Sequence, residues 1–415
     1  MKNIPRMNEI MIQQPSPLSR RYIEALVEEL AVDEKRYEQA ETSYKSVGSW
    51  LNRDTSTLAA FDPSVYVQGS FALGTVIKPL HADEEYDIDA VCELVELGKN
   101  EVTQAQLKEM VRVELELYRR SQSITKPLED SRRCWTLRYA DGAQFHMDVV
   151  PALPNAADTR QLLLDAQRDT SRAGTAIAIT DNEHRAYRSF SPDWPRSNPK
   201  GYLDWFRSRM SVILNEQKEI LAKRMNDSVD DIPDYRVRTP LQSSIMLLKR
   251  HRDMMYEKDE INCAPISIIL TTLSAHAYNG ERDIADALYS ILRDMDQFIF
   301  RDDRRRAIIP NPADPLENFS DKWEKNPERE EAFYEWLEQA RADFAAIASQ
   351  SDVNDMSKRL SDHMGTEIAE SAASRASGRS GSLLRGASSV APLAASSTPS
   401  FASTPSVPSK PKGFA

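Results

Sequence analysis

The chain has 415 residues, of which 40% are hydrophobic and 28% are charged, as is usual for a folded protein of one or two domains. Its net charge of −11 argues against non-specific binding to duplex nucleic acid, which depends on many lysine and arginine contacts to phosphates. The chain has no apolar run long enough for a membrane span or a secretory signal, and its three cysteines are widely spaced, so we expect a cytoplasmic protein without a zinc site or disulfide framework.

The first half of the chain alternates between helical and strand patterns. Apolar residues at helical spacing predict one long helix over residues 18–51 and another over 103–120. Side chains that alternate between apolar and polar predict strands over 64–68 and 86–94. Residues 134–152 contain two such runs around a turn and predict a hairpin. The first half is therefore expected to mix helices with a sheet.

After about residue 200 the pattern becomes helical. Thr239 followed by Pro240 predicts the start of a helix, because threonine is a good capping residue and proline is favoured in the first turn. Apolar periodicity predicts three more helices, over residues 266–278, 283–300 and 329–348.

The C-terminal segment differs in composition from the rest. From Ser371 onward it is rich in serine, alanine and proline and has few large apolar residues. Such a segment buries too little surface to offset the entropy of ordering, so it is predicted to be disordered. It carries five basic residues and no acidic ones, so the body of the protein is even more acidic than the whole chain.

Two carboxylates stand two residues apart in the strand expected at 86–94. Asp87 and Asp89 point to one face of that strand, whereas Ile88 and Ala90 point to the other. Neighbouring carboxylates repel each other unless cations lie close by. Two metal ions about 3.5–4 Å apart can bridge such a pair and clamp the oxygens of a phosphoryl transfer. Mg²⁺ is expected, because it prefers carboxylates together with phosphate oxygens and water.

Two further features accompany this pair. Gly69 and Ser70 fall where the first strand meets a helix, so the backbone can approach a phosphate and the hydroxyl can help to hold it. Asp148 interrupts an apolar strand, where a charge is costly unless it is paired or bound to metal. We expect it to be a metal ligand or the base that accepts a proton from an attacking hydroxyl. His146, by contrast, is expected to be a structural residue of the core.

These features resemble a known family. The Gly-Ser turn, the Asp-x-Asp strand and the later strand aspartate are similar to the nucleotidyltransferase superfamily of DNA polymerase beta type. More narrowly, the chain resembles the bacterial cGAS/DncV-like nucleotidyltransferases, or CD-NTases. Four segments carry this resemblance: residues 68–89, 145–151, 197–202 and 240–267.

The resemblance implies an α+β fold in which a polymerase-beta-like nucleotidyltransferase core with a mixed sheet packs on a C-terminal helical domain, followed by a disordered tail. Residues 1–200 would form the catalytic domain with its long N-terminal helix. Residues 201–350 would form the helical domain that completes the nucleotide site, and residues 351–415 the flexible tail.

The resemblance also implies an activity. CD-NTases make cyclic di- or trinucleotides from ribonucleoside triphosphates, and the product activates an effector in antiphage (CBASS) signalling. By this resemblance three aspartates carry catalysis and hold two Mg²⁺ ions, with Mn²⁺ as an alternative, while five other residues bind the triphosphate of ATP or another nucleotide. The aspartates are Asp87, Asp89 and Asp148, and the triphosphate residues are Gln68, Gly69, Ser70, Lys249 and Ser267.

The last residue, Ala415, suggests a protein partner. Some CD-NTases have a flexible tail with a small terminal residue, which a ubiquitin-transfer-like enzyme ligates to targets. The resemblance therefore implies such an enzyme as a partner at Ala415. Animal relatives sense duplex DNA through a zinc insertion, and the small number of cysteines here implies that this chain does not.

Two other functions remain open. The chain could be a linear oligonucleotide synthase or another nucleotidyltransferase, because cyclisation leaves no readable motif. A tRNA-modifying member is disfavoured, since an acidic body suits small nucleotides better than tRNA. The chain could also be a non-catalytic nucleotide-binding scaffold, although the full set of three aspartates argues against a degenerate site.

Overall fold

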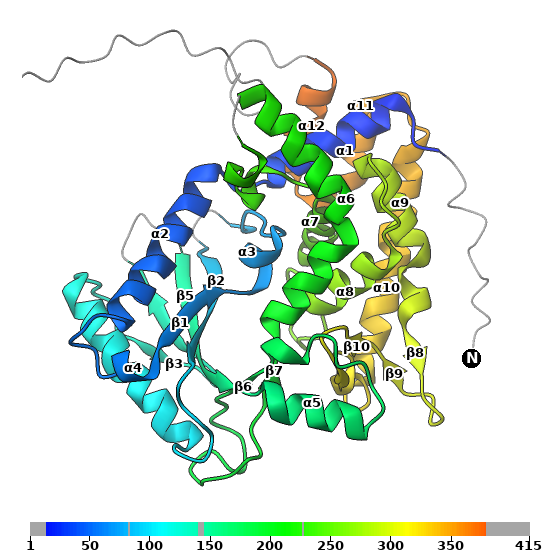
Figure 1. Cartoon of the computed structure of the whole chain (residues 1–415). Helices are drawn as coiled ribbons and strands as arrows, with labels where there is room; N and C mark the ends of the chain where they lie inside the picture. Colours follow the sequence, from blue (N-terminus) through cyan, green and yellow to red (C-terminus); the bar gives the residue numbers. More distant parts are fainter. Residues whose placement is uncertain (1–13, 82–83, 140–144, 226–227, 379–415) are drawn as a thin grey trace, which may run out of the picture.

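A mixed sheet dominates the first part of the chain, and helices dominate the rest (Figure 1). The structure is a computed structural model that describes residues 14–81, 84–139, 145–225 and 228–378. Its helices are α1 (Pro17–Leu30), α2 (Glu34–Leu51), α3 (Gly69–Leu73), α4 (Gln104–Ser121), α5 (Ala156–Asp165), α6 (Pro199–Met225), α7 (Pro240–Met255), α8 (Ser267–Ala277), α9 (Ile284–Asp294), α10 (Pro327–Ala348), α11 (Val353–Met364) and α12 (Thr366–Ala376).

The largest sheet has seven strands, in the order β1-β2-β5-β4-β3, and β6 and β7 extend it from β5. β2 and β5 run parallel, whereas β1 pairs antiparallel with β2, and β4 with β5. The predicted strands and hairpin are confirmed as β1, β2 and β4–β5. The strands are β1 (Pro63–Val67), β2 (Tyr86–Leu94), β3 (Glu129–Asp130), β4 (Trp135–Arg138), β5 (Phe145–Pro154), β6 (Ile177–Ile179), β7 (Arg196–Ser197), β8 (Phe300–Arg301), β9 (Ala307–Ile308), β10 (Pro310–Asn311) and β11 (Asp314–Asn318).

One face of this sheet is apolar and is covered by α2 and α4. Ile88 and Ala90 of β2 pack there with Met147 and Val149 of β5, and all four are fully buried. The predicted helix over 103–120 is confirmed as α4. Because side chains alternate along a strand, the residues between these apolar ones point to the opposite face.

The single helix expected over residues 18–51 is wrong, because the structure has two helices there. The break lies at Ala31, which is extended, and Asp33 then caps α2. Tyr22 of α1 packs in the core of the helical region, whereas Val47 of α2 packs against the sheet. Apolar periodicity runs through both helices, so it could not show that each half serves a different core.

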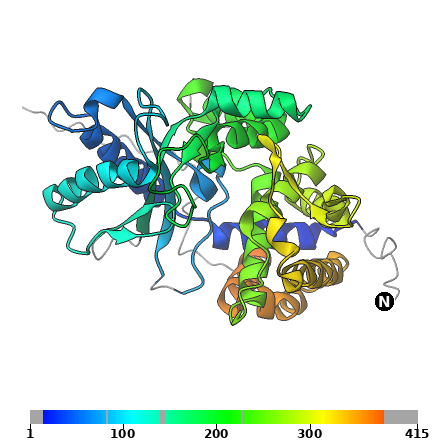
Figure 2. The same ribbon diagram turned by 90° about the horizontal axis from the view of Figure 1, so that it is seen from below.

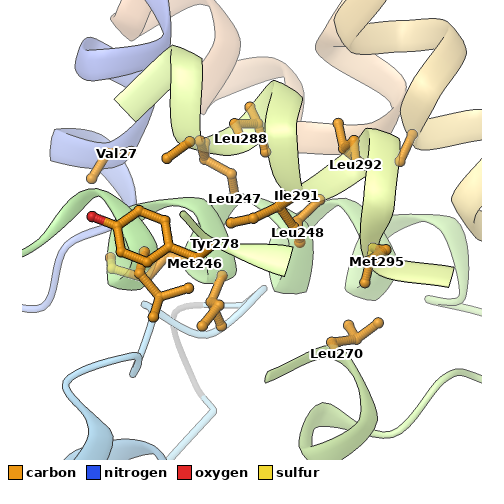
Figure 3. Close-up of a cluster of buried hydrophobic side chains, with 14 of the residues drawn as sticks. Val27, Met246, Leu247, Leu248, Leu270, Tyr278, Leu288, Ile291, Leu292 and Met295 are labelled. Atoms are coloured by element: carbon orange, nitrogen blue, oxygen red, sulfur yellow. The ribbon is translucent and has the colours of Figure 1, made fainter. Parts of the chain in front are cut away.

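α7 lies at the centre of the helical region. The helix start predicted at Thr239 and Pro240 is confirmed, and there Thr239 and Gln242 form a capping box in which each side chain accepts a hydrogen bond from the other's backbone amide. Helices expected over 266–278 and 329–348 are confirmed as α8 and α10, whereas the helix expected over 283–300 ends earlier, as α9. Figure 3 shows the apolar cluster that α7 forms with α1, α8, α9 and the residues after them; its labelled members are Val27, Met246, Leu247, Leu248, Leu270, Tyr278, Leu288, Ile291, Leu292 and Met295.

Two C-terminal helices correct the tail boundary expected at residue 351. α11 buries Met356 and Leu360, and α12 buries Ala369 and Ala372 close to α1 (Figure 2). The composition of α12 resembled that of a tail, but small side chains allow helices to pack closely. Residues 379–415, which include Ala415, lie outside the described residues. None of the described helices is both long and apolar enough to cross a membrane.

Candidate active site

The three aspartates singled out from the sequence meet on the face of the sheet opposite α2 and α4. β2 and β5 are paired in parallel so that Asp89 stands beside Asp148, and Asp87 stands beside His146. From the next strand, β4, the Thr136 hydroxyl donates a hydrogen bond of 2.5 Å to Asp148 Oδ1. Pairing between strands far apart in sequence therefore brings Asp148 to the pair Asp87 and Asp89, which alternation along one strand could not do.

The charges of these carboxylates are not balanced within the protein. Burial raises the pKa of Asp89 to about 7, with further contributions from Asp87 and Asp148. Burial, followed by the charge of Asp148, also raises the pKa of Asp87. Lys249 acts in the opposite direction at both positions without cancelling either shift. Oxygen donors that repel each other in this way are a suitable set for divalent cations, which fits the expected Mg²⁺ or Mn²⁺.

Gly69 starts α3 immediately beside this cluster. Its φ of +63° is a left-handed conformation that favours glycine, and a Cβ placed on it would lie 2.1 Å from Asp89 Oδ2. Before it, the amide of Gln68 donates a hydrogen bond of 2.8 Å to the carbonyl oxygen of Asp89. No other residue fits at position 69 without moving the Asp89 carboxylate.

A pocket of about 480 Å³ opens between the sheet and α7. Ser70 and Asp87 line it from the sheet side, and Lys249 and Arg252 line it from α7. The Lys249 ammonium donates a hydrogen bond of 3.0 Å to the Thr75 carbonyl, which ties α7 to the loop after α3. Burial, followed by the charge of Arg252, lowers the pKa of Lys249 to about 8. Ser70 and Lys249, both expected at the triphosphate, thus share one cavity with Asp87.

The four consecutive basic residues 249–252 do different things. Arg250 donates hydrogen bonds to the carbonyl oxygens of Lys78 and Pro79, and so holds the loop that forms part of the pocket wall. His251 is fully buried and lies 3.1 Å from Asp343 of α10. Of the four, only Lys249 and Arg252 line the pocket.

Ser267, expected to contact the triphosphate, is placed less directly. It is the exposed first residue of α8 and does not line the pocket. Its Oγ accepts a hydrogen bond of 3.2 Å from Arg252, which also bonds to the carbonyl of Pro265. The structure therefore connects Ser267 to the pocket through Arg252.

Two residues at this site, His146 and Glu85, were not expected from the sequence. His146, expected to be structural, lies with Nε2 3.4 Å from Asp87 Oδ1. Its other nitrogen, Nδ1, lies 3.4 Å from a carboxylate oxygen of Glu85. One signal was available: His146 stands two residues before Asp148, so both share a strand face. Its proximity to Asp87, however, depends on the strand register.

Comparison with known proteins agrees with this geometry. Residues 63–151 match the family described as "Cyclic GMP-AMP synthase DncV-like, nucleotidyltransferase domain". The matched segment contains Gly69 and all three aspartates. This part of the chain is therefore similar to the DncV-like nucleotidyltransferase domain. A c-di-GMP synthase of Roseivirga ehrenbergii is 29% identical to this nucleotidyltransferase over 315 residues, which cover 75% of each chain. The cyclic dinucleotide synthase CdnG of Bradyrhizobium diazoefficiens is 26% identical over 317 residues, covering 72% of this chain and 70% of CdnG.

Solved structures of nucleotidyltransferases similar to this chain have the same fold. The structure of the Bradyrhizobium diazoefficiens CdnG in complex with GTP superposes with a TM-score of 0.63 at 20% identity, covering 86% of this chain and 98% of CdnG. Vibrio cholerae DncV in complex with a linear intermediate gives a TM-score of 0.53 at 14% identity over 86% and 98% of the two chains. The expected α+β fold, with a mixed sheet and a C-terminal helical region, is confirmed.

Proposed function

We propose that this nucleotidyltransferase joins ribonucleoside triphosphates into a cyclic di- or trinucleotide. The observation that carries the proposal is the cluster of Asp87, Asp89 and Asp148 on one sheet face, from which Asp87 lines a pocket together with Ser70 and Lys249. The two curated relatives are cyclic dinucleotide synthases, which supports a cyclic rather than a linear product. GTP is the first substrate to test, because one relative is a c-di-GMP synthase.

The donor set suits two divalent cations, Mg²⁺ or Mn²⁺, which would be held by Asp87, Asp89 and Asp148. When bound, such ions neutralise the carboxylates and the developing charge on the transferring phosphoryl group. In this proposal Asp148 would also accept the proton of the attacking ribose hydroxyl. Its Oδ1 accepts the Thr136 hydrogen bond, which fixes the carboxylate and leaves its second oxygen available for such a role.

The triphosphate of the donor would lie in the pocket beside these aspartates. The Ser70 hydroxyl and the backbone around Gly69 can donate hydrogen bonds to its oxygens. Lys249 supplies positive charge from the α7 side, and Ser267 would be held in place by Arg252. Gln68 contributes through its backbone, which is bonded to Asp89. These groups bind and orient, and the rate of transfer depends on that orientation.

The proposed biological setting rests on the resemblance to CD-NTases. We propose that the product is a second messenger that activates an effector in antiphage defence, and that the reaction takes place in the cytoplasm. The free, buried state of Cys92, Cys134 and Cys263 is compatible with a reducing compartment. A ubiquitin-transfer-like enzyme acting on Ala415 would be the activating partner.

The test is to incubate the pure protein with all four ribonucleoside triphosphates and Mg²⁺ or Mn²⁺, and to analyse the phosphatase-treated products by mass spectrometry. The control is the double variant Asp87→Asn/Asp89→Asn. A phosphatase-resistant cyclic oligonucleotide that is absent from the control is the expected result. Phosphatase-sensitive linear chains would instead assign a linear synthase, and transfer by the double variant would remove the aspartates from the mechanism.

A further inference from the structure

His146 has an unusual position among the histidines of this chain. It stands in strand register with Asp87 and two residues before Asp148, so that its side chain shares the acidic face of the sheet. His146, Asp87 and Asp148 each offer one possible ligand atom, and these three atoms lie within 4.8 Å of one another. The ring nitrogen Nε2 is 3.4 Å from Asp87 Oδ1. Ligands about 2.1 Å from one octahedral ion would be about 3 Å apart, so His146 Nε2 and Asp87 Oδ1 are already near this spacing.

The other ring nitrogen points to a carboxylate that is itself held in place. His146 Nδ1 is fully buried and has no hydrogen bond of ordinary geometry to any described residue. A carboxylate oxygen of Glu85 lies 3.4 Å from it. Glu85 in turn accepts a hydrogen bond of 2.8 Å from Arg138 and one of 3.0 Å from Lys126. A histidine that binds metal through one nitrogen normally donates the other N–H to such a carboxylate, which fixes the ring.

We propose that His146 Nε2 is a nitrogen ligand of one of the divalent cations held by Asp87 and Asp148, with Glu85 as the acceptor that orients the ring. This inference rests on the proposed metal-dependent function and adds a residue outside the three aspartates. The site then offers oxygen and nitrogen together. Imidazole favours transition metals, whereas Mg²⁺ prefers oxygen ligands alone. His146 therefore makes this position prefer Mn²⁺ over Mg²⁺.

The described residues contain a second histidine–carboxylate group, and it provides a useful contrast. His251, His363 and Asp343 are also close enough together to hold a metal. There, however, Asp343 is already paired with Arg359 at 2.9 Å and lies 2.6 Å from His363. Its negative charge is satisfied by protein groups, so a cation would have to compete with an arginine. At His146 the neighbouring Asp87 and Asp148 have no such arginine partner among the described residues. A cation would therefore bind these carboxylates without competing with an arginine.

The experiment uses the full chain and Mn²⁺ alone, with metal binding rather than product as the readout. Titration followed by the EPR signal of free Mn²⁺ gives the affinity, and competition gives that of Mg²⁺. Pulsed EPR of bound Mn²⁺ detects a directly coordinated imidazole nitrogen, and labelling with ¹⁵N-histidine shifts that signal. The variants are His146→Gln, Glu85→Gln and, as a matched control, His184→Gln, since His184 has the same 21% side-chain exposure and also faces a carboxylate.

The expected result is a histidine nitrogen signal in the unaltered protein that His146→Gln abolishes and His184→Gln retains. Loss of His146 should weaken Mn²⁺ binding by about 10-fold or more, with a smaller effect on Mg²⁺. Glu85→Gln should keep the nitrogen signal and weaken Mn²⁺ binding. Bound Mn²⁺ with only oxygen ligands would overturn the inference while leaving the metal-dependent function intact. Failure of the unaltered protein to bind Mn²⁺ would overturn both. The labelled unaltered protein decides the question even if His146→Gln does not fold.

Discussion

The acidic face of the sheet and the basic run of α7 lie on opposite sides of one pocket, yet their charges are handled in opposite ways. On the sheet, Asp87 and Asp89 stand together with raised pKa values, and protein groups leave them only partly compensated. On α7, Arg250 and Arg252 donate hydrogen bonds to carbonyl oxygens and a side chain of other elements. The uncompensated carboxylates of the sheet thus mark the side of the pocket that needs a bound cation. The hydrogen bonds of the α7 arginines hold the pocket wall in place.

The strongest test of this contrast is Asp89→Asn. Nucleotide transfer should fall about 10³-fold or more, since the metal site supplies several kcal/mol of transition-state stabilisation. Without metal, the variant should be more stable than the parent at pH 8, by about 1–3 kcal/mol, because a repelled carboxylate is removed. Product analysis by mass spectrometry and denaturant unfolding in chelator measure the two effects.

The same variant should change the pH dependence of stability. The pKa of Asp89 is about 7 in the folded protein and lower in the unfolded chain, so the folded state holds this proton more tightly between about pH 4 and 7. The free energy of unfolding of the metal-free parent should therefore fall as the pH rises through this window. Asp89→Asn should show a smaller fall; an equal fall in both proteins would contradict the origin assigned to it.

Gly69→Ala should have the next largest effect, and Gly280→Ala is its control. Both glycines have positive φ, +63° and +85°, so both substitutions add backbone strain of about 1–2 kcal/mol. At position 69 the new methyl group also displaces the Asp89 carboxylate, whereas at 280 it meets nothing within 4 Å. Thermal unfolding should show similar losses, but only Gly69→Ala should lose activity, by about 100-fold. Equal activities would show that the close approach to Asp89 has no catalytic consequence.

A smaller effect is expected from Lys249→Met on the α7 side. Loss of the ammonium group should raise the KM for the nucleoside triphosphate by about 10-fold, equivalent to about 1.4 kcal/mol, because the phosphates lose one charge partner. The fold should tolerate the change, since Lys249 is 8% exposed and its charge is already disfavoured by burial. Lys258→Met, on an exposed residue outside the pocket, is the control for steady-state kinetics. A purely lower kcat in Lys249→Met would assign this residue to the chemical step instead.

The smallest effect on activity should come from removing residues 379–415. We expect unchanged basal synthesis, because every residue assigned above to catalysis or to the triphosphate lies before residue 379. Removing residues 371–415 should instead lower stability by about 1–2 kcal/mol, since it deletes buried Ala372 and Ala373 and the ion pairs of Arg375 with α1. Thermal unfolding of the two truncated proteins compares them. Equal melting temperatures would show that the end of α12 contributes nothing to the helical core.

The residues on the two sides of the pocket also differ in how far the sequence could predict their roles. Alternation along a strand was enough to place Asp87 and Asp89 on one face, and a capping threonine was enough to start α7. The position of His146 could not be predicted, because it follows from the parallel register of β2 with β5. The roles of Arg250 and His251 depend on contacts with distant loops and helices. Local patterns report on one element, whereas these roles arise between elements.

The break between α1 and α2 and the unexpected helices α11 and α12 have a common cause. The amphipathic pattern of α1 is compatible with packing against the helical core or against the sheet. α12 has so few large side chains that its sequence does not indicate a packed helix. The packing of α1 can be explained only with α12 in place, and that of α12 only with α1, because the buried alanines of α12 pack against α1. Mutual burial of this kind has no signature in either segment alone.

The pairing of α1 with α12 also has a consequence during protein synthesis. Glu29 and Arg375, which join these helices, are 346 residues apart. At about 5–20 residues per second, a ribosome makes the second roughly 20–70 s after the first. During that interval the nascent chain carries α1 with Tyr22 and Leu26 still lacking part of their cover. The helical core, and with it the α7 wall of the pocket, can close fully only when translation is nearly complete, so an interrupted chain would remain a client for chaperones and proteases.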